Sequence, residues 1–341
     1  MPIARKPRRP GPTIWTVAAH AGVSQMTVSR YLRGERIMPE NQEKVAQAIA
    51  ELGYRYNDTA SELASRQPSR IGALVFDVDD WAPQRVLAGA AEAARQSGHL
   101  LEMIRCDVDD RESVDTALQM MNRASLAGVV VLSPPDMVLE RMDLSSLQTP
   151  WMIEVEPDIP SGHPMALRHP MSRAVRHLAG LGHERFFYLG GPTQWPSGRN
   201  RRTAYRDTVA ELGLVDCGDT EGPWGAENGY DAMRHFPLDD HPTAIVAASD
   251  QIALGAMSWL RERGLSVPND VSITGYDGLR DAAFYATPLT TIAIDFGAMG
   301  RRAVQALLAG EGLGSPPAME QYPFSSELVI RASTAAPHRA R

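Results

Sequence analysis

The sequence predicts a small all-α helix-turn-helix headpiece with a hinge helix, joined to a two-lobed α/β body built from doubly wound parallel sheets. Two observations lead to this fold class. Short helical patterns broken by glycines fill residues 13–56, whereas short apolar runs alternate with longer amphipathic segments from Ile71 onward. The alternation predicts βαβ units, and a break near Pro157–Pro164 divides them into two lobes.

The composition is that of an ordinary globular protein. The chain has 341 residues, of which 43% are hydrophobic and 22% are charged. This length predicts two or three domains, because one core rarely grows beyond about 250–300 residues. No apolar run approaches the roughly 18 residues of a membrane span, and the basic start lacks the apolar region of a secretory signal. Cys106 and Cys217 form neither a disulfide framework nor a metal-ligand spacing. We therefore expect a cytoplasmic protein without a metal or cofactor.

The charge is unevenly distributed along the chain. Residues 1–70 carry eleven Lys and Arg against six Asp and Glu, a net charge of +5, whereas the rest carries −12, for −7 overall. A basic head on an acidic body indicates a polyanionic partner for the head alone. The alternative is a disordered basic tail without a partner, and charge by itself does not decide between the two.

The first 70 residues divide into a tail, a headpiece and a hinge. Residues 1–12 are rich in Pro and Arg and are expected to be disordered. Within the headpiece, residues 13–56, Gly22 ends the first helical pattern, Ser24 is a good N-cap for the second, and Gly53 stops the third. Residues 57–70 contain a weak helix and a linker, because Asn57–Ser65 is too short to be stable alone.

The body is expected to span residues 71–331, followed by a tail at 332–341. Lobe 1 comprises about 71–157 and 297–319, and lobe 2 about 163–285 and 320–331, with crossings near 157–162 and 285–295. The expected strands are Ile71–Phe76, Leu100–Ile104, Gly128–Leu132, Trp151–Val155, Met165–Leu167, Phe186–Leu189, Ala244–Ala247, Val271–Gly275 and a late Glu320–Ile330. The expected helices are Gln84–Gln96, Arg111–Arg123, Met171–Leu181, Arg199–Leu212, Ala226–His235, Gln251–Arg263 and Phe296–Leu308.

The second helix of the headpiece exposes polar side chains that match the edges of DNA bases. In a helix-turn-helix this helix enters the major groove with its N-terminal residues against the bases, where Gln suits adenine, Arg suits guanine and Met packs on a thymine methyl. The candidates for base contacts are Gln25, Met26, Ser29 and Arg30, and those for phosphate contacts are Thr13, Trp15, Ser24, Thr27 and Asn41. The alternative is a helical subdomain with a solvated polar face.

Several motifs together resemble the lactose/galactose repressor family of bacterial transcription regulators. They are TIWTVAAHAGVSQMTVSR at residues 13–30, ELGYRYN at 51–57, SDQIALG at 249–255, VSITGYD at 271–277 and PLTTIAIDF at 288–296. The resemblance extends from about Thr13 to Arg331 and implies a headpiece followed by a two-lobed, periplasmic-binding-protein-like body.

The resemblance also implies a role for the hinge. In that family the segment folds into a helix on the operator, and paired helices insert leucines into the minor groove. Leu63 occupies the position of that leucine, with Ala60 on the same helix face and Asn57 at the start of the segment. Insertion of an apolar side chain unstacks a base step and bends the duplex. The alternative for Leu63 is packing against the body.

A cleft between two α/β lobes suits a polar small ligand at the carboxyl ends of the strands. Trp81, Trp195 and Trp224 fall in predicted loops after strands, where they either stack on a sugar or belong to the core. The resemblance implies effector contacts from Trp81, Glu154, Arg199, Arg201, Trp224, Ser249, Asp250, Asp277 and Phe296. The alternative for Arg201 and Asp277 is a structural ion pair. Two departures from the family pattern, Ser249 in place of Asn and Ile294 in place of Gln, remove amide groups and leave the identity of the sugar open.

These features predict a DNA-binding repressor whose operator affinity is lowered by a small sugar. A corepressor-dependent regulator or activator of the same family, and a sugar-binding transport protein, are the alternatives. An enzyme is not expected, since there is no phosphate-binding Gly-rich loop, G-x-S-x-G motif or paired Cys/His set. A palindromic operator requires two heads, and no leucine heptads follow Ile330, so we expect a homodimer that does not bind membranes.

Overall fold

The computed structural model describes residues 12–32, 35–54, 68–76, 79–108, 110–237, 241–314 and 325–338. The chain divides into two compact units, Met1–Gln67 and Pro68–Arg341. Almost all of the predicted basic tail, and the predicted hinge with Asn57, Ala60 and Leu63, lie outside the described residues. Within those residues, no helix is both long and apolar enough to cross a membrane.

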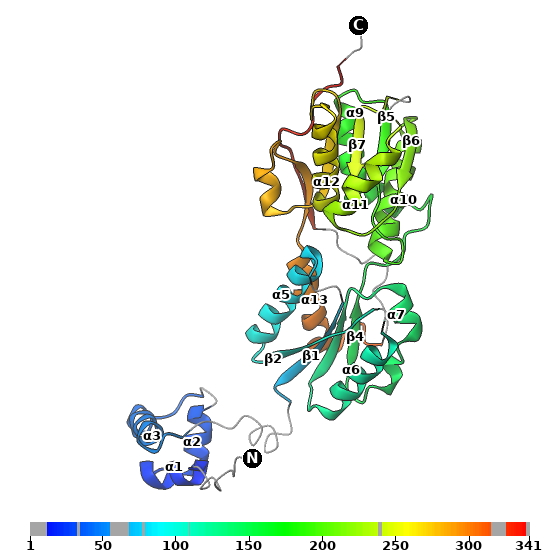
Figure 1. The fold of residues 1–341 in the computed structure, drawn as a ribbon. Coiled ribbons are helices and arrows are strands. Elements are labelled where there is room, and N and C mark those ends of the chain that lie inside the picture. Colours follow the sequence, from blue (N-terminus) through cyan, green and yellow to red (C-terminus); the bar gives the residue numbers. More distant parts are fainter. Residues whose placement is uncertain are drawn as a thin grey trace, which may run out of the picture. The chain divides into compact units, whose positions relative to one another are not determined.

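The headpiece is a small helical unit (Figure 1) whose turn is made by Gly22, which has a φ of 65°. Thr13 caps the first helix, because its hydroxyl accepts a hydrogen bond from the Thr16 N–H and the Thr16 hydroxyl accepts one from the Thr13 N–H. The helices are α1 (Ile14–Ala21), α2 (Gln25–Leu32) and α3 (Pro39–Leu52). They enclose a core of Val17, Ala18, Val28, Val45 and Ala48.

Lobe 1 is a parallel sheet with the strand order β2-β1-β3-β4. Helices α5 and α13 cover one face, and α6 and α7 cover the other (Figure 1). Its strands are β1 (Arg70–Val75), β2 (Leu100–Arg105), β3 (Gly128–Leu132) and β4 (Trp151–Glu154). Its helices are α5 (Trp81–Gln96), α6 (Arg111–Arg123), α7 (Asp136–Arg141), the short η1 (Leu144–Ser146) and α13 (Phe296–Ala309).

Lobe 2 has the strand order β10-β9-β8-β7-β5-β6, in which only the pairing of β10 with β9 is antiparallel among the described strands. Its strands are β5 (Arg185–Leu189), β6 (Val215–Thr220), β7 (Ala244–Ala247), β8 (Ser272–Asp277), β9 (Thr290–Ile294) and β10 (Ser326–Val329). Its helices are α8 (Pro164–Arg168), α9 (Met171–Gly180), α10 (Pro196–Glu211), α11 (Ala226–Ala232), η2 (Met233–His235), α12 (Asp250–Glu262) and η4 (Arg280–Phe284). The core between them is rich in fully buried aromatic side chains, including Phe186, Tyr188 and Tyr205.

The chain passes from one lobe to the other between β4 and α8, returns between β9 and α13, and passes again between α13 and β10. These crossings leave the carboxyl ends of strands from both lobes at one cleft. In doubly wound sheets the carboxyl ends are where ligands bind.

The observed elements differ from the predicted ones in lobe 2. The predicted strand Met165–Leu167 is wrong, since these residues belong to α8, which starts at Pro164 and is capped by the side chain of His163. Strands β6 and β9, and helix α7 of lobe 1, were not predicted. Within the predicted late strand Glu320–Ile330, residues 326–329 form β10, which pairs antiparallel with β9, and residues 320–324 lie outside the described residues.

The segment predicted as a tail at 332–341 is bound to lobe 2 as far as it is described. The Ser333 hydroxyl donates to the Ile273 carbonyl and accepts from the Thr290 N–H. The Ala335 carbonyl accepts hydrogen bonds from the buried His183 and from Ser272. This segment therefore completes the hydrogen bonding of β8 and β9.

Candidate functional site

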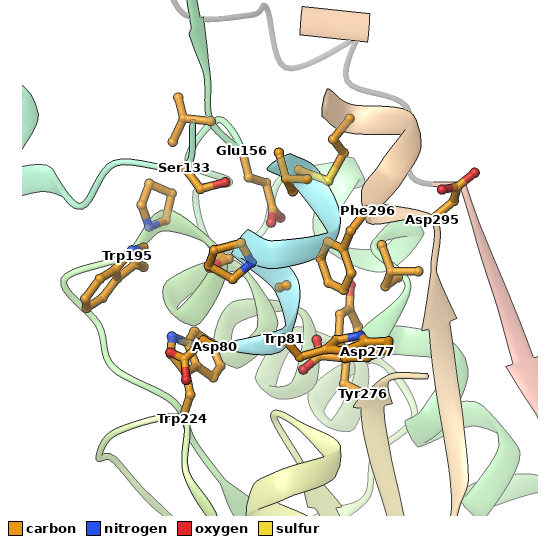
Figure 2. A pocket seen from close by; sticks show the side chains of 18 of the residues that line it. Asp80, Trp81, Ser133, Glu156, Trp195, Trp224, Tyr276, Asp277, Asp295 and Phe296 are labelled. Atoms are coloured by element: carbon orange, nitrogen blue, oxygen red, sulfur yellow. The ribbon is translucent and has the colours of Figure 1, made fainter. Parts of the chain in front are cut away.

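A cavity of about 310 Å³ lies between the two lobes. This volume is near the lower end of the roughly 300–1,000 Å³ typical of small-molecule sites, so the cavity suits a ligand of one or two rings. Figure 2 shows side chains from both lobes turned toward it. Lobe 1 and its helix α13 supply, among others, Asp80, Trp81, Val86, Ser133, Glu156, Phe296, Met299 and Arg302, and lobe 2 supplies Trp195, Arg201, Trp224, Gln251, Tyr276 and Asp277.

Aromatic side chains enter this cavity from the ends of several elements. Trp81 is the first residue of α5, Trp195 is the N-cap of α10, and Trp224 lies in the loop between β6 and α11. Phe296 begins α13 and Tyr276 is near the end of β8. The tryptophans that the sequence placed in loops thus line one cavity, although Trp81 belongs to a helix that begins three residues earlier than predicted.

Arg201 and Asp277 form a salt bridge in this cavity, with Nη2 of Arg201 3.1 Å from an Asp277 carboxylate oxygen. The guanidinium lies 4.0 Å from the ring centre of Tyr276 and 4.8 Å from that of Trp224, and it donates to the Ala248 carbonyl. Both side chains are at least nine-tenths buried. Among the described residues, Arg201 Nε has no hydrogen-bond partner, whereas Oδ1 of Asp277 is the oxygen that pairs with Nη2 of Arg201. A buried N–H group such as Nε requires an acceptor, which a ligand in the cavity can supply.

Burial raises the pKa of the Asp277 carboxyl to about 6, although the charge of Arg201 opposes the shift. Burial and the nearby Asp277 raise the pKa of Asp250 to about 8. Asp250 lies behind the cavity wall, where its two oxygens accept hydrogen bonds from the Thr291 hydroxyl and the Leu279 N–H. Burial therefore moves the pKa values of both carboxyls from the acidic range toward neutral pH.

A buried polar network supports the lobe crossing beside the cavity. Glu156 lines the cavity and accepts hydrogen bonds from Asn200 and His169. Burial alone would raise the pKa of Glu156, but these hydrogen bonds and the charge of Arg201 outweigh it and hold the pKa below its usual value. Because the His169 ring stacks on Tyr276, the network connects the crossing to the salt bridge.

The backbone is strained where each lobe meets the cavity. Asp277, at the end of β8, has a φ of 103°, and Ser133, after β3, has a φ of 50°. Non-glycine residues adopt such angles at an energetic cost and do so most often at ligand sites. The strain directs these two side chains from opposite lobes into the same space.

Several residues predicted to contact an effector do not line the cavity. Glu154 is buried and ion-paired with Arg302 from α13. Arg199 is paired with Asp136 of lobe 1 and Asp158 of the crossing. Ser249 caps α12, and Asp250 lies behind the wall as described above. The predicted residues that do line the cavity are Trp81, Arg201, Trp224, Asp277 and Phe296.

Other residues of the cavity were not predicted, although some of them stand beside predicted ones. Asp80 directly precedes Trp81, and Glu156 follows Glu154 by two positions, so that both lie at the carboxyl end of a strand or just after it. Arg302 and Met299 come from α13. Which face of α13 lies toward the cavity depends on how the chain connects the two lobes, and the periodicity of the sequence does not indicate it.

In the headpiece, Trp15 and Met26 are strongly exposed, at 68% and 63%. The hydroxyls of Thr13 and Ser24 cap α1 and α2, with Ser24 accepting from the Thr27 N–H. Arg30 is exposed, 3.7 Å from Glu35, whereas Gln25, Thr27, Ser29 and Asn41 are half-buried. Contact of these exposed residues with DNA stays a prediction.

The fold and the two sites define a two-lobed ligand-binding body carried on the same chain as a helix-turn-helix unit. Residues 13–57 match the family described as bacterial regulatory proteins, lacI family, and residues 175–334 match a periplasmic binding protein-like domain. The chain is 30% identical over 331 residues to the lactose operon repressor of Escherichia coli K12, covering 96% of this chain and 91% of that protein.

The chain is also 30% identical over 340 residues to the transcriptional repressor PurR of Haemophilus influenzae strain PittEE, covering 94% of this chain and 98% of that repressor. The crystal structure of a lac repressor dimer bound to operator and the anti-inducer ONPF superposes with a TM-score of 0.78 at 29% identity, covering 96% of this chain and all of that chain. The chain belongs to the lacI family of bacterial DNA-binding transcription regulators.

Proposed function

We propose that this protein is a repressor whose affinity for its operator falls when a small sugar binds between the lobes. The observation that carries the proposal is the buried Arg201–Asp277 pair in a cavity walled by Trp81, Trp195 and Trp224. A sugar offers hydroxyls that accept from the guanidinium and donate to the carboxylate. It also offers an apolar ring face that packs on an aromatic side chain.

The alternative effector is a purine, because the relatives include PurR as well as the lactose operon repressor. A purine also stacks on tryptophan. The sugar is favoured because the Arg201 guanidinium, whose Nε lacks a partner among the described residues, and the Asp277 carboxylate present a donor and an acceptor side by side. Two neighbouring hydroxyls of a sugar can accept from the donor and donate to the acceptor, and a sugar ring carries several such pairs of hydroxyls.

Both lobes contribute to the cavity, so an effector that binds there changes how the lobes lie relative to each other. We expect the sugar to close the cleft and shift lobe 1, which is continuous with the segment 57–70. A marginal hinge helix that orders on DNA is a bistable element, and a small shift of its attachment can melt it. A corepressor would have the opposite sign, and because coupling is reciprocal, operator DNA would then strengthen sugar binding.

A homodimer accounts for a hydrophobic face of lobe 2. Phe284, at the end of η4, is 86% exposed, and a groove of about 440 Å³ lies nearby, lined by residues that include Leu254, Met257 and Tyr285. A protruding side chain and a groove on one face suit a two-fold contact, in which each copy fills the groove of the other. Two headpieces would then read a palindromic operator in the cytoplasm.

The test uses the full chain and a fragment of residues 68–341, which has its own cores. Mono- and disaccharides, and hypoxanthine and guanine for comparison, are screened by thermal shift, since a ligand of the native state raises the melting temperature. A duplex is selected from a random DNA library with the full chain. We expect both proteins to bind the same sugar, only the full chain to bind the duplex, and the sugar to weaken that binding. A purine that binds where no sugar does would contradict the proposed effector.

A further inference from the structure

Glu154 is the carboxylate of lobe 1 that the sequence assigned to the effector, but it is engaged elsewhere. Its side chain is 2% exposed and forms an ion pair with Arg302, while the cavity lining passes in front of it through Val155 and Glu156. A buried carboxylate that is neutralised by an arginine costs several kcal/mol to separate from its partner. Glu154 therefore supports α13 and does not face a ligand.

Asp80 brings another carboxylate of lobe 1 to the cavity. It is the N-cap residue of α5, but its side chain makes no capping hydrogen bond, and it is half-buried in the cavity lining. Figure 2 shows it among the side chains of the pocket together with Asp277. The charge of Asp80 is one cause of the raised pKa of Asp277, so the two groups are close enough to interact across the cleft.

The charges around the cavity restrict the kind of ligand that fits. Arg201 is paired with Asp277, and Arg302 is paired with Glu154, so each of these cations of the lining already has a carboxylate. On the lobe 1 side the lining contains two further carboxylates, Asp80 and Glu156, of which Glu156 accepts hydrogen bonds from His169 and Asn200. These carboxylates would repel an anionic ligand, and each arginine among the described lining residues already pairs with a carboxylate. A hydroxyl or an amine, by contrast, can donate a hydrogen bond to a carboxylate.

We propose that Asp80 is the lobe 1 carboxylate that selects the effector, and that the effector is an uncharged sugar that donates hydrogen bonds at one end to Asp80 and at the other to Asp277. The inference rests on the proposed sugar effector and specifies its class. Sugar phosphates and uronic acids are excluded by charge. A donor at each end also offsets the repulsion between the two carboxylates, so the same contacts that select the ligand favour closure of the lobes.

The experiment uses the full chain and matched sets of sugars, namely glucose, galactose and mannose, each with its 6-phosphate and its uronic acid, together with their neutral disaccharides. Isothermal titration measures the affinity of each sugar that raises the melting temperature. We expect the neutral compounds to bind and their anionic derivatives to bind at least about tenfold more weakly. An anionic derivative that binds more tightly than its neutral parent overturns the inference, although the proposed sugar effector stands.

The variant that tests Asp80 is Asp80→Asn, and its control is Asp79→Asn. Asp79 is the neighbouring carboxylate, but it is strongly exposed, is paired with Arg105 and is outside the cavity lining. Asparagine is a good N-cap, so D80N is expected to fold with an unchanged melting temperature. Loss of a charged acceptor predicts an affinity for the best neutral sugar about tenfold or more below that of the wild type in D80N, and less than about twofold below it in D79N.

Monodeoxy derivatives of that sugar separate a direct contact from a structural effect. If one hydroxyl donates to Asp80, its removal weakens binding to the wild type but not to D80N, because the interaction is already absent there. The inference is overturned, but the proposed function is not, if D80N binds the sugar as tightly as the wild type does. The same holds if each deoxy sugar loses the same affinity in both proteins. Binding of purines but of no sugar, charged or neutral, overturns the proposed function and the inference with it.

Discussion

Arg201 and Asp277 lie far apart in the sequence, yet they form a salt bridge 3.1 Å long between α10 and the end of β8. The pair is a buried ion pair, which is one of the two predicted interpretations, and it also lines the cavity, where its contact with an effector stays a prediction. A buried pair adds little stability compared with apolar side chains, but removal of one partner leaves a buried charge. We therefore propose that the pair serves ligand binding more than the net stability of the fold.

Replacement of Arg201 by Gln is expected to lower the free energy of unfolding by about 3–5 kcal/mol and to abolish measurable effector binding, because Asp277 is left buried without its cation. Arg206→Gln is the matched control, since Arg206 lies on the same helix but pairs with Asp219, and its side chain is half-exposed. Chemical denaturation and sugar titration measure both effects. Equal losses in the two variants would contradict the special role of Arg201.

The stability of the body is expected to fall as the pH rises from about 4 to about 8. Asp277 and Asp250 have pKa values of about 6 and about 8 in the folded protein, against about 3.9 in an unfolded chain. The folded state therefore binds more protons in this window, and its advantage is lost as the pH passes through the folded values. Melting temperatures between pH 5 and 8.5 measure the slope.

The variant Asp277→Asn separates these two contributions to the pH dependence. It removes the loss of stability that occurs near pH 6. It also moves the loss caused by Asp250 to lower pH, because the Asp277 charge is one cause of the raised pKa of Asp250. Two independent steps, with the upper one unmoved in D277N, would show that the carboxyls do not interact.

Helices α5 and α13 form a wall of the cavity and touch through glycines. A Cβ at Gly300 would lie 1.8 Å from the Val86 carbonyl oxygen. Gly300→Ala is therefore expected to destabilise the protein by about 1–3 kcal/mol or more and to weaken effector binding, because α13 carries Phe296. Gly180→Ala is the control, since no atom lies within 4 Å of its Cβ position in α9. That change should be neutral or stabilise by up to about 1 kcal/mol.

Arg30→Ala is expected to cost about 1–3 kcal/mol of operator affinity at one base position if the guanidinium pairs with guanine. Binding to a set of single-base operator variants measures the effect. Lys44→Ala is the comparison, because Lys44 lies on α3 and pairs with Glu40, and it should change no base preference. A uniform loss across all variants would assign Arg30 to a phosphate.

The sequence was sufficient for the elements whose pattern is local. The helices of the headpiece were predicted because Gly22, Ser24 and Gly53 mark their ends through left-handed turns and capping. By contrast, β6 was missed because this strand is polar and irregular, with its pairing to β5 shifted between Phe186 and Tyr188. The triplet Met165–Leu167 is too short for its apolar character to separate a strand from a turn of helix.

The residues of the cavity also divide into those that a local sequence pattern identifies and those that depend on distant parts of the chain. Arg201, Trp224 and Asp277 were identified by motifs that lie next to strand ends, where the topology alone brings them to the cleft. The role of Glu154 depends on Arg302, which is 148 positions away and reaches it only because α13 returns to lobe 1. Periodicity and spacing contain no information about such a pairing, so the ion pair of Glu154 with Arg302 became visible only in three dimensions.

The segment around Ser333 and Ala335 that fastens β8 has a consequence for how the protein is made. Lobe 1 lacks α13 until the ribosome has translated residues up to 309, and lobe 2 lacks the hydrogen bonds of Ser333 and Ala335 until residues up to 335 have been translated. Neither lobe can therefore finish folding while earlier parts of the chain emerge, unlike a protein whose domains are consecutive in sequence. A premature stop codon before Ser333 would release a product that lacks the hydrogen bonds to Ile273 and Thr290, and we expect chaperones and proteases to act on it.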